Sequence, residues 1–231
     1  MTLSESICNP LISIIQSNLD AILALRDTRR LKQDQSYVSD GDLLCEQLII
    51  NYFRKFGENT LVVSEESCKV DFVDAAEGSM IVTLDPIDGT ENFVSGLKEW
   101  GIGISVYKGM HHFESLIALP ELNEYLITGE KTAKYNSRIS GISSSLTKED
   151  LQRLEEGFEY RIIGCSMYNM FNVIRGSFNS FENPKGAYSW DILPGLNLAL
   201  EHKLDVTVEN KPYNGEFLQP NTKYRFRICN I

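Results

Sequence analysis

The sequence predicts a layered α/β or α+β fold, in which sheets and helices stack around a buried core. Short β-rich runs and amphipathic helical patterns are interspersed along the whole chain. Apolar residues make up 42% and charged residues 23% of the 231 residues, which is ordinary globular composition and argues against general disorder. The chain shows no internal repeat, low-complexity tract or obvious linker, which favours one large domain or two closely packed ones.

The first part of the chain contains two helical patterns followed by a series of strand-like runs. Apolar residues recur at helical spacing over 11–23, with a polar opposite face. A second helix is predicted over 40–56, with Ser39 or Asp40 as its N-cap and Gly57 after its last turn. The expected strands that follow are 60–63, 80–84, 101–107, 113–119 and 125–128.

The second part of the chain alternates more evenly between helices and strands. Thr147 and Asp150 form a capping-box pattern at the start of the first helix. The expected helices are 147–156, 166–175 and 189–201. The expected strands are 160–163, 177–182, 204–208 and 224–228. The weakest pattern, 129–145, is rich in Ser, Gly and Lys and predicts a surface loop or the seam between two halves.

The charge balance restricts the class of ligand. Lys and Arg number 22 against 32 Asp and Glu, a net charge of −10. Such an acidic chain is a poor candidate for non-specific nucleic-acid binding, which depends on cations that neutralise phosphates. It can still bind an anionic substrate if metal cations lie between the protein and the ligand.

The cysteine count and the N-terminal pattern indicate the compartment. Five cysteines without a CxxC pair favour reduced thiols over a disulfide framework. The apolar pattern near the N-terminus is interrupted by Gln16, Ser17, Asn18 and Asp20, which argues against a signal peptide or a membrane span. We therefore expect a cytoplasmic protein that does not associate with membranes.

The most informative motif is Asp-Pro-Ile-Asp-Gly-Thr, which follows an apolar strand. Asp85 and Asp88 lie three positions apart, and converging carboxylates repel each other unless a cation or a shared proton joins them. Oxygen ligands suit Mg²⁺ or Ca²⁺ better than zinc. The N–H groups of Gly89 and Thr90 suit a phosphate. The alternative is a capped turn in which both aspartates only bind backbone amides.

Two further acidic segments also place carboxylates at the boundary of a predicted strand or helix. Glu65 and Glu66 come directly after the apolar run 61–63, so they too lie at the end of a strand. The alternative for this pair is a solvated acidic loop. Trp190 and Asp191 open the last long helix, where the alternative is an N-capping aspartate beside a core tryptophan.

The order of these three pieces resembles the inositol monophosphatase superfamily of Mg²⁺-dependent, lithium-sensitive phosphatases. That superfamily includes fructose-1,6-bisphosphatase-, bisphosphate nucleotidase- and histidinol-phosphatase-like members. The resemblance extends from about Lys32 to Thr207. It implies a layered α-β-α-β-α sandwich of the sugar phosphatase type and a homodimer. The expected organisation is a single phosphatase domain, 1–231, with a metal-binding α+β half (1–140) and an α/β half (141–231).

The resemblance also implies roles for particular residues. Glu66 resembles a family residue that is a ligand of more than one metal ion. It also resembles a catalytic residue of the family. Asp85, Asp88 and the backbone carbonyl of Ile87 resemble further ligands, and Asp191 resembles the ligand of a second ion on the leaving-group side.

The attacking water and the substrate are assigned in the same way. Asp42 resembles the aspartate that pairs with Thr90 to orient the water, and Asp40 is the rival for that position. Asp88, Gly89 and Thr90 are the expected phosphate-binding residues. The expected substrate pocket comprises Gly164, Cys165, Ser166 and, from two ambiguous counterparts, Glu182 or Asn183.

The implied function is hydrolysis of a phosphate monoester on a small sugar, polyol or amino-alcohol metabolite, with two or three Mg²⁺ ions activating the water. One alternative is a 3′(2′),5′-bisphosphate nucleotidase, against which the negative charge of Glu91 argues mildly, since it should repel a second phosphate. An alternative of another class is a catalytically silent homologue with a binding or regulatory role. The altered segment after the Trp-Asp helix, Leu200-Glu201-His202-Lys203, favours that alternative, whereas the carboxylates retained at all four expected ligand positions argue against it.

Overall fold

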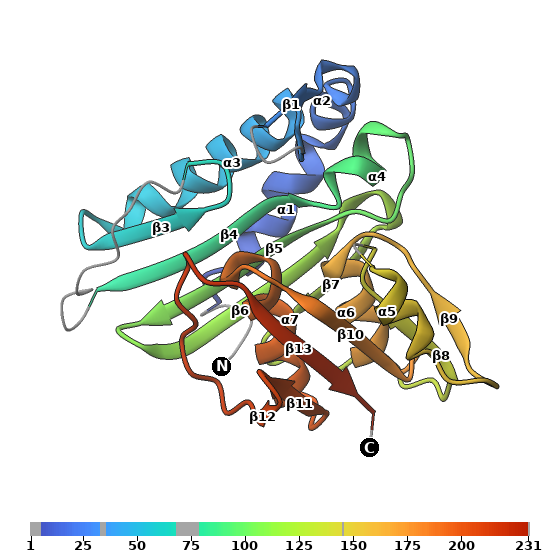
Figure 1. Cartoon of the computed structure of the whole chain (residues 1–231). Coiled ribbons are helices and arrows are strands. Elements are labelled where there is room, and N and C mark those ends of the chain that lie inside the picture. The colour runs from blue at the N-terminus through green and yellow to red at the C-terminus, as the bar shows by residue number, and fades with distance from the viewer. Residues whose placement is uncertain (1–5, 33–35, 68–78, 145, 231) are drawn as a thin grey trace.

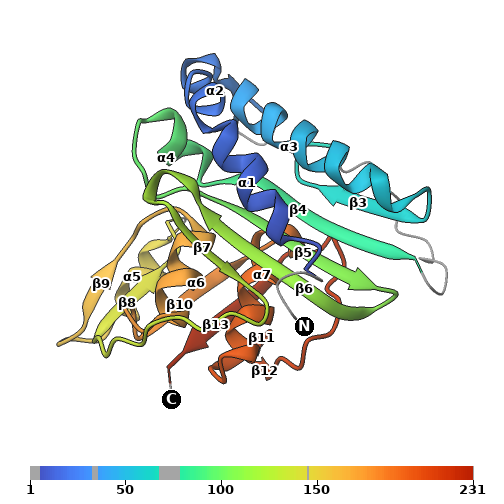
Figure 2. The same cartoon turned by 180° about the vertical axis from the view of Figure 1, so that it is seen from behind.

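The computed structural model describes residues 6–32, 36–67, 79–144 and 146–230. Two sheets are stacked with helices between them and outside them, which confirms the predicted layered α/β architecture (Figures 1 and 2). The helices are α1 (Asn9–Ser17), α2 (Leu19–Leu23), α3 (Asp40–Phe53), α4 (Thr90–Val94), α5 (Lys148–Gln152), α6 (Ser166–Ile174) and α7 (Ser189–Glu201), with 3₁₀ turns η2 (Arg26–Thr28), η3 (Arg54–Phe56) and η4 (Pro120–Leu122).

The first sheet comes from the N-terminal part of the chain and the second from the C-terminal part. In spatial order the first sheet contains β3 (Thr60–Ser64), β4 (Met80–Asp88), β5 (Gly101–Lys108), β6 (His111–Leu119) and β7 (Glu124–Ile127). The second contains β12 (Lys211–Pro212), β11 (Asp205–Val208), β13 (Tyr224–Cys229), β10 (Ser180–Ala187), β8 (Ile139–Ile142) and β9 (Glu159–Arg161). A separate pair, β1 (Arg30–Leu31) and β2 (Tyr37–Val38), lies beside α3.

The layers follow from the alternation of side chains along the strands. On β4, Val82 and Leu84 belong to the core cluster shared with α1 and α3, whereas Ile81 belongs to the cluster shared with α6, α7 and the second sheet. Gly103 on β5 allows α6 and α7 to approach closely, because a Cβ there would lie 2.1 Å from the Met167 Cε. The two sheets are thus joined through α6 and α7.

The start of α3 is fixed by a capping box, which settles the open choice of N-cap. Ser39 is the N-cap, and its hydroxyl accepts from the N–H of Asp42 at 3.3 Å. Asp42 completes the box, since its Oδ2 accepts from the backbone N–H of Ser39 at 2.8 Å. Asp42 is fully buried, so the same interaction that starts the helix holds this carboxylate inside the protein.

The largest difference from the predicted elements is in the segment 129–145. We expected a loop or seam there, but residues 139–142 form β8, which pairs in parallel with both β9 and β10. The sequence Ile-Ser-Gly-Ile is too short and too polar to predict a strand by itself, and its neighbours in the sheet stabilise it. The expected boundary between the halves at residue 140 therefore falls inside a strand.

Three other elements differ in length or continuity. The helical pattern over 11–23 is divided into α1 and α2 at Asn18, whose Nδ2 donates to the Ile14 carbonyl at 2.8 Å and competes with the backbone bonds. The helix predicted over 147–156 ends at Gln152, although its predicted Thr147–Asp150 capping box is present. The strand predicted over 177–182 begins at Ser180 and continues to Ala187, with a register shift around Pro184 that tolerates its missing N–H.

Four of the five cysteines lie among the described residues. Cys8, Cys45, Cys165 and Cys229 are buried free thiols. Among the described residues, no helix combines the length and the apolar character that crossing a bilayer requires.

Candidate active site

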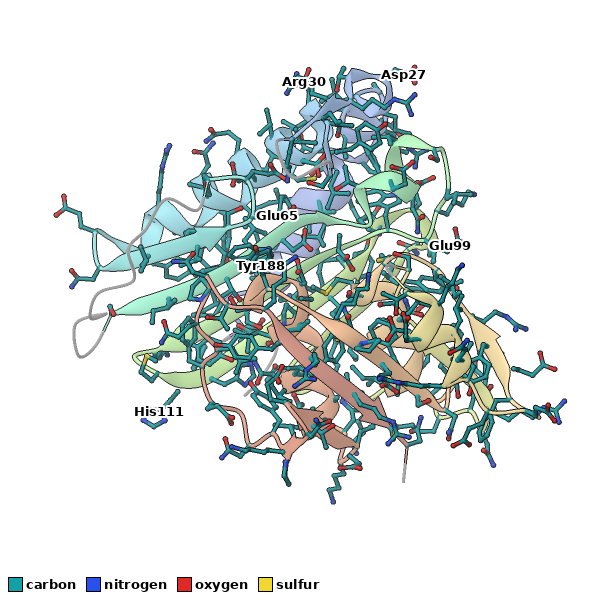
Figure 3. The ribbon with its side chains drawn as sticks, viewed as in Figure 1. Asp27, Arg30, Glu65, Glu99, His111 and Tyr188 are labelled. Atoms are coloured by element: carbon teal, nitrogen blue, oxygen red, sulfur yellow. The ribbon has the colours of Figure 1, made fainter. Side chains whose placement is uncertain are left out.

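A hollow of about 340 Å³ lies where the two halves of the chain meet. The ends of β3 and β4 line it from one side, and the start of α6, the start of α7 and a turn in β10 line it from the other. In Figure 3, Glu65 and Tyr188 mark the two sides near the middle of the molecule. The motifs that are far apart in the sequence therefore converge on one pocket.

Three carboxylates form the floor of this pocket. Glu65, Asp85 and Asp191 each offer an oxygen, and these atoms all lie within 4.8 Å of one another. The backbone N–H of Glu65 donates to the Leu84 carbonyl at 3.1 Å, which fixes the end of β3 beside Asp85 on β4. Asp191 is held by its position in the first turn of α7, where its Oδ2 accepts from the Tyr188 N–H at 2.8 Å.

The electrostatics of the floor favour a bound cation. Burial, followed by the negative charge of Glu65, raises the pKa of both Asp85 and Asp191 well above the ordinary value. Asp85 is only 1% exposed, and its Oδ1 has no hydrogen-bond partner among the described residues. A buried acceptor without a hydrogen-bond partner is costly, and so is the repulsion between neighbouring negative charges. A bound divalent ion would contact the acceptor and neutralise the charges. The oxygen-only donor set fits Mg²⁺.

The glutamate in this cluster is Glu65. The family resemblance instead assigns the metal-ligand role to Glu66. Lys32 binds both side chains: its Nζ lies 2.8 Å from the Glu65 Oε1 and 2.6 Å from the Glu66 Oε1. Burial raises the pKa of Glu66 to about 7. The metal-ligand role of Glu66 stays a prediction, while the geometry supports Glu65 for the floor.

The expected contact between Asp42 and Thr90 is present. The Thr90 hydroxyl lies 3.2 Å from the Asp42 Oδ1 and 3.0 Å from the Ile87 carbonyl oxygen. Burial raises the pKa of Asp42, although hydrogen bonds from Ser39 oppose the shift. Asp40, the rival position, forms an ion pair with Arg30 at 2.6 Å and does not line the pocket.

Asp88 is directed toward the start of α6. Its Oδ2 accepts from the Cys165 thiol at 3.0 Å and from the backbone N–H of Met167. Burial raises its pKa to about 6, and these hydrogen bonds limit the increase. Asp88 lines the pocket but is outside the three-carboxylate cluster, so its ligand role stays a prediction.

The backbone after Asp88 requires glycine. Gly89 has a φ of +81°, and a Cβ there would lie 2.9 Å from the Cys165 Cβ. Gly89 thus permits the close approach of the two halves, and α4 begins immediately after it at Thr90. Gly89 and Thr90 both line the pocket, and their phosphate-binding role stays a prediction.

The expected substrate-pocket residues divide into two groups. Gly164, Cys165, Ser166 and Asn183 line the pocket. Glu182 is exposed and lines a different hollow, because adjacent residues of a strand point to opposite faces. Of the two ambiguous counterparts, the structure therefore places Asn183 at the pocket and Glu182 away from it.

Sequence reasoning missed three residues at the pocket rim. Lys185, Tyr188 and Lys223 line the pocket. Tyr188 and Lys185 lie shortly before the Trp-Asp pair, so the motif's neighbourhood offered a signal. Lys223 comes from the start of β13, and only the strand pairing brings it here.

Comparison with known proteins identifies the class, that of metal-dependent phosphatases, and the acidic floor of the pocket is consistent with it. A model of the inositol monophosphatase family matches residues 4–149, and the chain belongs to this family. Its members are metal-dependent phosphatases.

The curated relatives have different stated activities. A fructose-1,6-bisphosphatase/inositol-1-monophosphatase of Thermotoga maritima is 26% identical over 185 residues, which cover 71% of this chain and 68% of that protein. A 3′(2′),5′-bisphosphate nucleotidase CysQ of Haemophilus influenzae is 25% identical over 126 residues, 53% of this chain and 47% of that protein. A putative Nus factor SuhB of Neisseria meningitidis is 29% identical over 163 residues, 70% of this chain and 58% of that protein. The chain spans less than two thirds of the last two relatives.

Solved structures support the fold. An IMPase of Thermotoga maritima superposes with a TM-score of 0.78 at 22% identity, covering 96% of this chain and 91% of that chain. An IMPase/NADP phosphatase complexed with Mg²⁺ and phosphate gives 0.75 at 20% identity, covering 97% and 88%. At these identities the likeness establishes the architecture, and the substrate has to be argued from the site.

Proposed function

We propose that this protein hydrolyses a phosphate monoester on a small sugar, polyol or amino-alcohol metabolite with the help of Mg²⁺. The single observation that supports this most strongly is the cluster of Glu65, Asp85 and Asp191, whose oxygens lie within 4.8 Å of one another on the floor of a pocket. A phosphate ester is an anion, so this floor repels it unless cations reverse the local charge.

The residues that would hold Mg²⁺ are Glu65, Asp85 and Asp191, with Asp88 and the Ile87 carbonyl as further candidates. Bound Mg²⁺ supplies charge neutralisation, a water of lowered pKa and stabilisation of the leaving oxygen. Phosphoryl transfer depends mainly on positioning and charge stabilisation, so no Ser, Cys or His nucleophile is required.

The chain's own contribution to the attack is the Asp42–Thr90 pair. The buried Asp42 carboxylate accepts from the Thr90 hydroxyl at 3.2 Å and so orients the oxygen of Thr90. With its own hydroxyl proton directed at Asp42, the Thr90 oxygen can accept a hydrogen bond from a water in the pocket and so hold that water for attack. Asp191, on α7, lies across the pocket floor and belongs to the leaving-group side in this assignment.

The proposal also covers the metal count, the oligomeric state, the location and the domain organisation. We include two or three Mg²⁺ ions per site, a homodimer, a cytoplasmic location and a single domain in which α6 and α7 join the two sheets. The net charge of −10 favours a small metabolite over nucleic acid as the partner. The SuhB relatives are described as Nus factors, which keeps a binding role as the alternative of another class.

The test is a phosphatase screen across sugar, polyol, nucleotide and histidinol phosphates, with Mg²⁺ and with EDTA. We expect phosphate release that requires Mg²⁺. Asp42→Asn should lower kcat by about 10²- to 10⁴-fold, the range for a group that assists proton transfer. Asp40→Asn, which alters only a surface ion pair, is the matched control and should keep full activity.

The outcomes separate the candidate functions. No metal-dependent release from any substrate would indicate the binding-only homologue. A clear preference for an adenosine bisphosphate over a hexose phosphate would indicate the nucleotidase that the CysQ relatives represent.

A further inference from the structure

The charge of the residues that line the pocket is negative at its floor and positive at its rim. Among the described residues that line it, the carboxylates are Glu65, Asp85 and Asp191 of the floor, together with Asp88, which is directed toward the start of α6. The basic residues in the same lining are Lys185 and Lys223. A chain with a net charge of −10 thus presents two cations and no carboxylate on the described rim.

Lys185 is presented by an irregular turn inside β10. The register of β10 against β13 shifts between Asn183 and Ala187. Within this bulge, the Asn183 Oδ1 accepts from the backbone N–H of Lys185 at 3.1 Å and of Gly186 at 3.0 Å. The side chain of Asn183 therefore fixes the turn, and bulges commonly redirect a side chain in this way.

Lys223 reaches the same rim because β13 packs against that turn. Gly186 has a φ of +84°, and a Cβ there would lie 3.1–3.2 Å from backbone atoms of Tyr224. Ala187 pairs with Tyr224, the first residue of β13, so Lys223 lies immediately before β13 and next to the turn. The Nζ of Lys223 lies 4.9 Å from the ring centroid of Tyr188, which orients its charge over the pocket wall.

The other described residues at the pocket rim are neutral, and the glutamate expected to repel a second anion lies outside the pocket lining. Ser143, Ser144 and Asn183 contribute polar atoms to the wall. Glu91, which on sequence grounds should repel a second phosphate, is exposed and is not part of the lining. Among the described residues that line the rim there is thus no carboxylate, although Lys185 also interacts electrostatically with Asp150, which lies outside this lining.

We infer that the substrate carries a second anionic group, a carboxylate or a second phosphate, which Lys185 and Lys223 bind while the scissile phosphate lies at the acidic floor. This inference rests on the proposed function and specifies its substrate class. A volume of about 340 Å³ suits a small molecule. Charge-assisted contacts of this kind give specificity and orient the leaving group.

The scaffold between the two anionic groups is a sugar or a short acyclic chain. Tyr188 already stacks on Trp190, with ring centroids 4.9 Å apart, and lies under the Lys223 ammonium. A nucleobase could use the face that Lys223 covers only by displacing it. The aromatic wall is therefore not a free stacking surface, which favours the smaller scaffold over a nucleotide.

The experiment compares substrates that differ only in the second charge. Glycerol 3-phosphate is matched with 3-phosphoglycerate, and fructose 6-phosphate with fructose 1,6-bisphosphate. We expect kcat/KM to be at least about tenfold higher for the more anionic member of one pair or both, as for one charge-assisted contact. The pair that shows the preference identifies the second group as a carboxylate or a phosphate, and rising salt should reduce the preference.

The lysine variants test the assignment directly. Lys223→Gln and Lys185→Gln should each raise KM for the preferred substrate about tenfold and leave kcat/KM for its less anionic partner within twofold. Lys211→Gln, an exposed lysine outside this pocket, is the matched control and should change neither value. All three positions are exposed, so folding should be preserved and melting temperatures should agree.

Two failures are distinguishable. If the wild type releases phosphate from both members of each pair equally, or if the lysine variants alter both members equally, the second-anion subsite is wrong and the phosphatase function stands. If Mg²⁺ supports no release from any member, the proposed function itself fails.

Discussion

Glu65 and Glu66 are neighbours in the chain, but their carboxylates have different surroundings. Glu65 shares the floor with Asp85 and Asp191, whereas Glu66 is outside that cluster. We predict that Glu65→Gln lowers kcat/KM at least about 100-fold and shifts the Mg²⁺ dependence to higher concentration, because it removes a charged ligand. Glu66→Gln should cost less than about tenfold, since it removes only one partner of Lys32. Initial rates over a Mg²⁺ titration measure both effects.

A larger loss in Glu66→Gln than in Glu65→Gln would restore the assignment made from the motif alone. Lys32→Gln serves as a control, since it releases both glutamates without removing either carboxylate. Its effect separates loss of the ion pair from loss of a metal ligand.

Single residues show where sequence reasoning succeeds and where it stops. The Asp42–Thr90 contact was predictable because each residue belongs to a motif with a characteristic neighbour. The choice between Glu65 and Glu66 was not predictable. Adjacent side chains in a turn point in different directions, and the spacing of residues in the sequence does not give those directions. Lys223 was also missed, because its place depends on the pairing of β13 with β10.

At the scale of elements, the turn between β4 and α4 depends on a glycine. Gly89→Ala combines a positive φ of +81° with a Cβ only 2.9 Å from the Cys165 Cβ. Gly96→Ala is the matched control, because φ is +78° but no atom lies within 4 Å of its Cβ. We predict a loss of about 1 kcal/mol for the control and about 2–4 kcal/mol for Gly89→Ala, since overpacking adds to the backbone cost. Denaturant unfolding measures both.

The same pair distinguishes a local from a catalytic effect. Gly89→Ala should also lower activity, because it moves the turn that carries Asp88, whereas Gly96→Ala should keep it. Equal destabilisation by the two substitutions would show that the contact with Cys165 relaxes without cost.

The β5–β6 hairpin contains a half-buried histidine, His112, that affects acid stability. The His112 Nε2 lies 2.8 Å from the Ser115 hydroxyl, and burial lowers the pKa of His112 to about 4. Between about pH 6.5 and 4 the unfolded chain therefore binds more protons at this residue than the folded protein does, so stability falls as the pH decreases. The contribution is about 2 kcal/mol after allowance for partial exposure.

His112→Gln keeps the hydrogen bond to Ser115 and should remove this part of the acid dependence. His111→Gln, at the exposed tip of the hairpin (Figure 3), should leave the dependence unchanged. Unfolding free energies measured from pH 4 to pH 7 test the prediction, and parallel curves for the wild type and His112→Gln would contradict it.

The elements themselves were predictable where a pattern repeats over several turns or strand residues. Strands β4 to β6 and helices α3, α6 and α7 fall close to their expected positions, because each has a continuous apolar face. The short strand β8 was not predictable, because its four residues gain their stability from β9 and β10 on either side. Likewise, the strand predicted over 177–182 continues past Pro184 to Ala187, because the bulge accommodates the missing N–H of this proline.

At the scale of the whole molecule, the site exists only when the two halves are joined. Glu65 and Asp85 come from the first sheet, whereas Asp191 comes from α7 and Cys165 precedes α6. Asn92 adds a direct link, since its Nδ2 donates to the Glu99 carbonyl at 2.7 Å and to the Ile163 carbonyl at 2.8 Å. Metal binding at the floor should therefore stabilise the whole fold and not one half alone.

The stabilisation of the fold by a bound metal depends on pH, and the direction of that dependence follows from the pKa values of the carboxyl groups. Burial raises the pKa of Asp88 to about 6 and that of Glu66 to about 7. At these two carboxyls the folded, metal-free protein therefore binds more protons than the unfolded chain between about pH 4 and pH 7, so their contribution to stability falls as the pH rises through that window, opposite in sign to the contribution of His112. Ions that bind the deprotonated carboxylates reverse this loss.

We therefore predict that Mg²⁺ stabilises the protein more at pH 7.5 than at pH 5. At a Mg²⁺ concentration of 100 Kd the gain is about 2.7 kcal/mol, or about 5–10 °C in Tm for a chain of this size. Asp191→Asn should abolish the Mg²⁺ response yet leave the EDTA-treated protein as stable as the wild type or more so, because it removes a half-buried like charge while Asn can still accept from the Tyr188 N–H. Asp205→Asn, an exposed position on β11, should respond to Mg²⁺ as the wild type does. Thermal melts at both pH values decide the matter: an equal Mg²⁺ shift in Asp191→Asn would mean that the ion binds elsewhere, because the floor carboxylates could then not be its ligands.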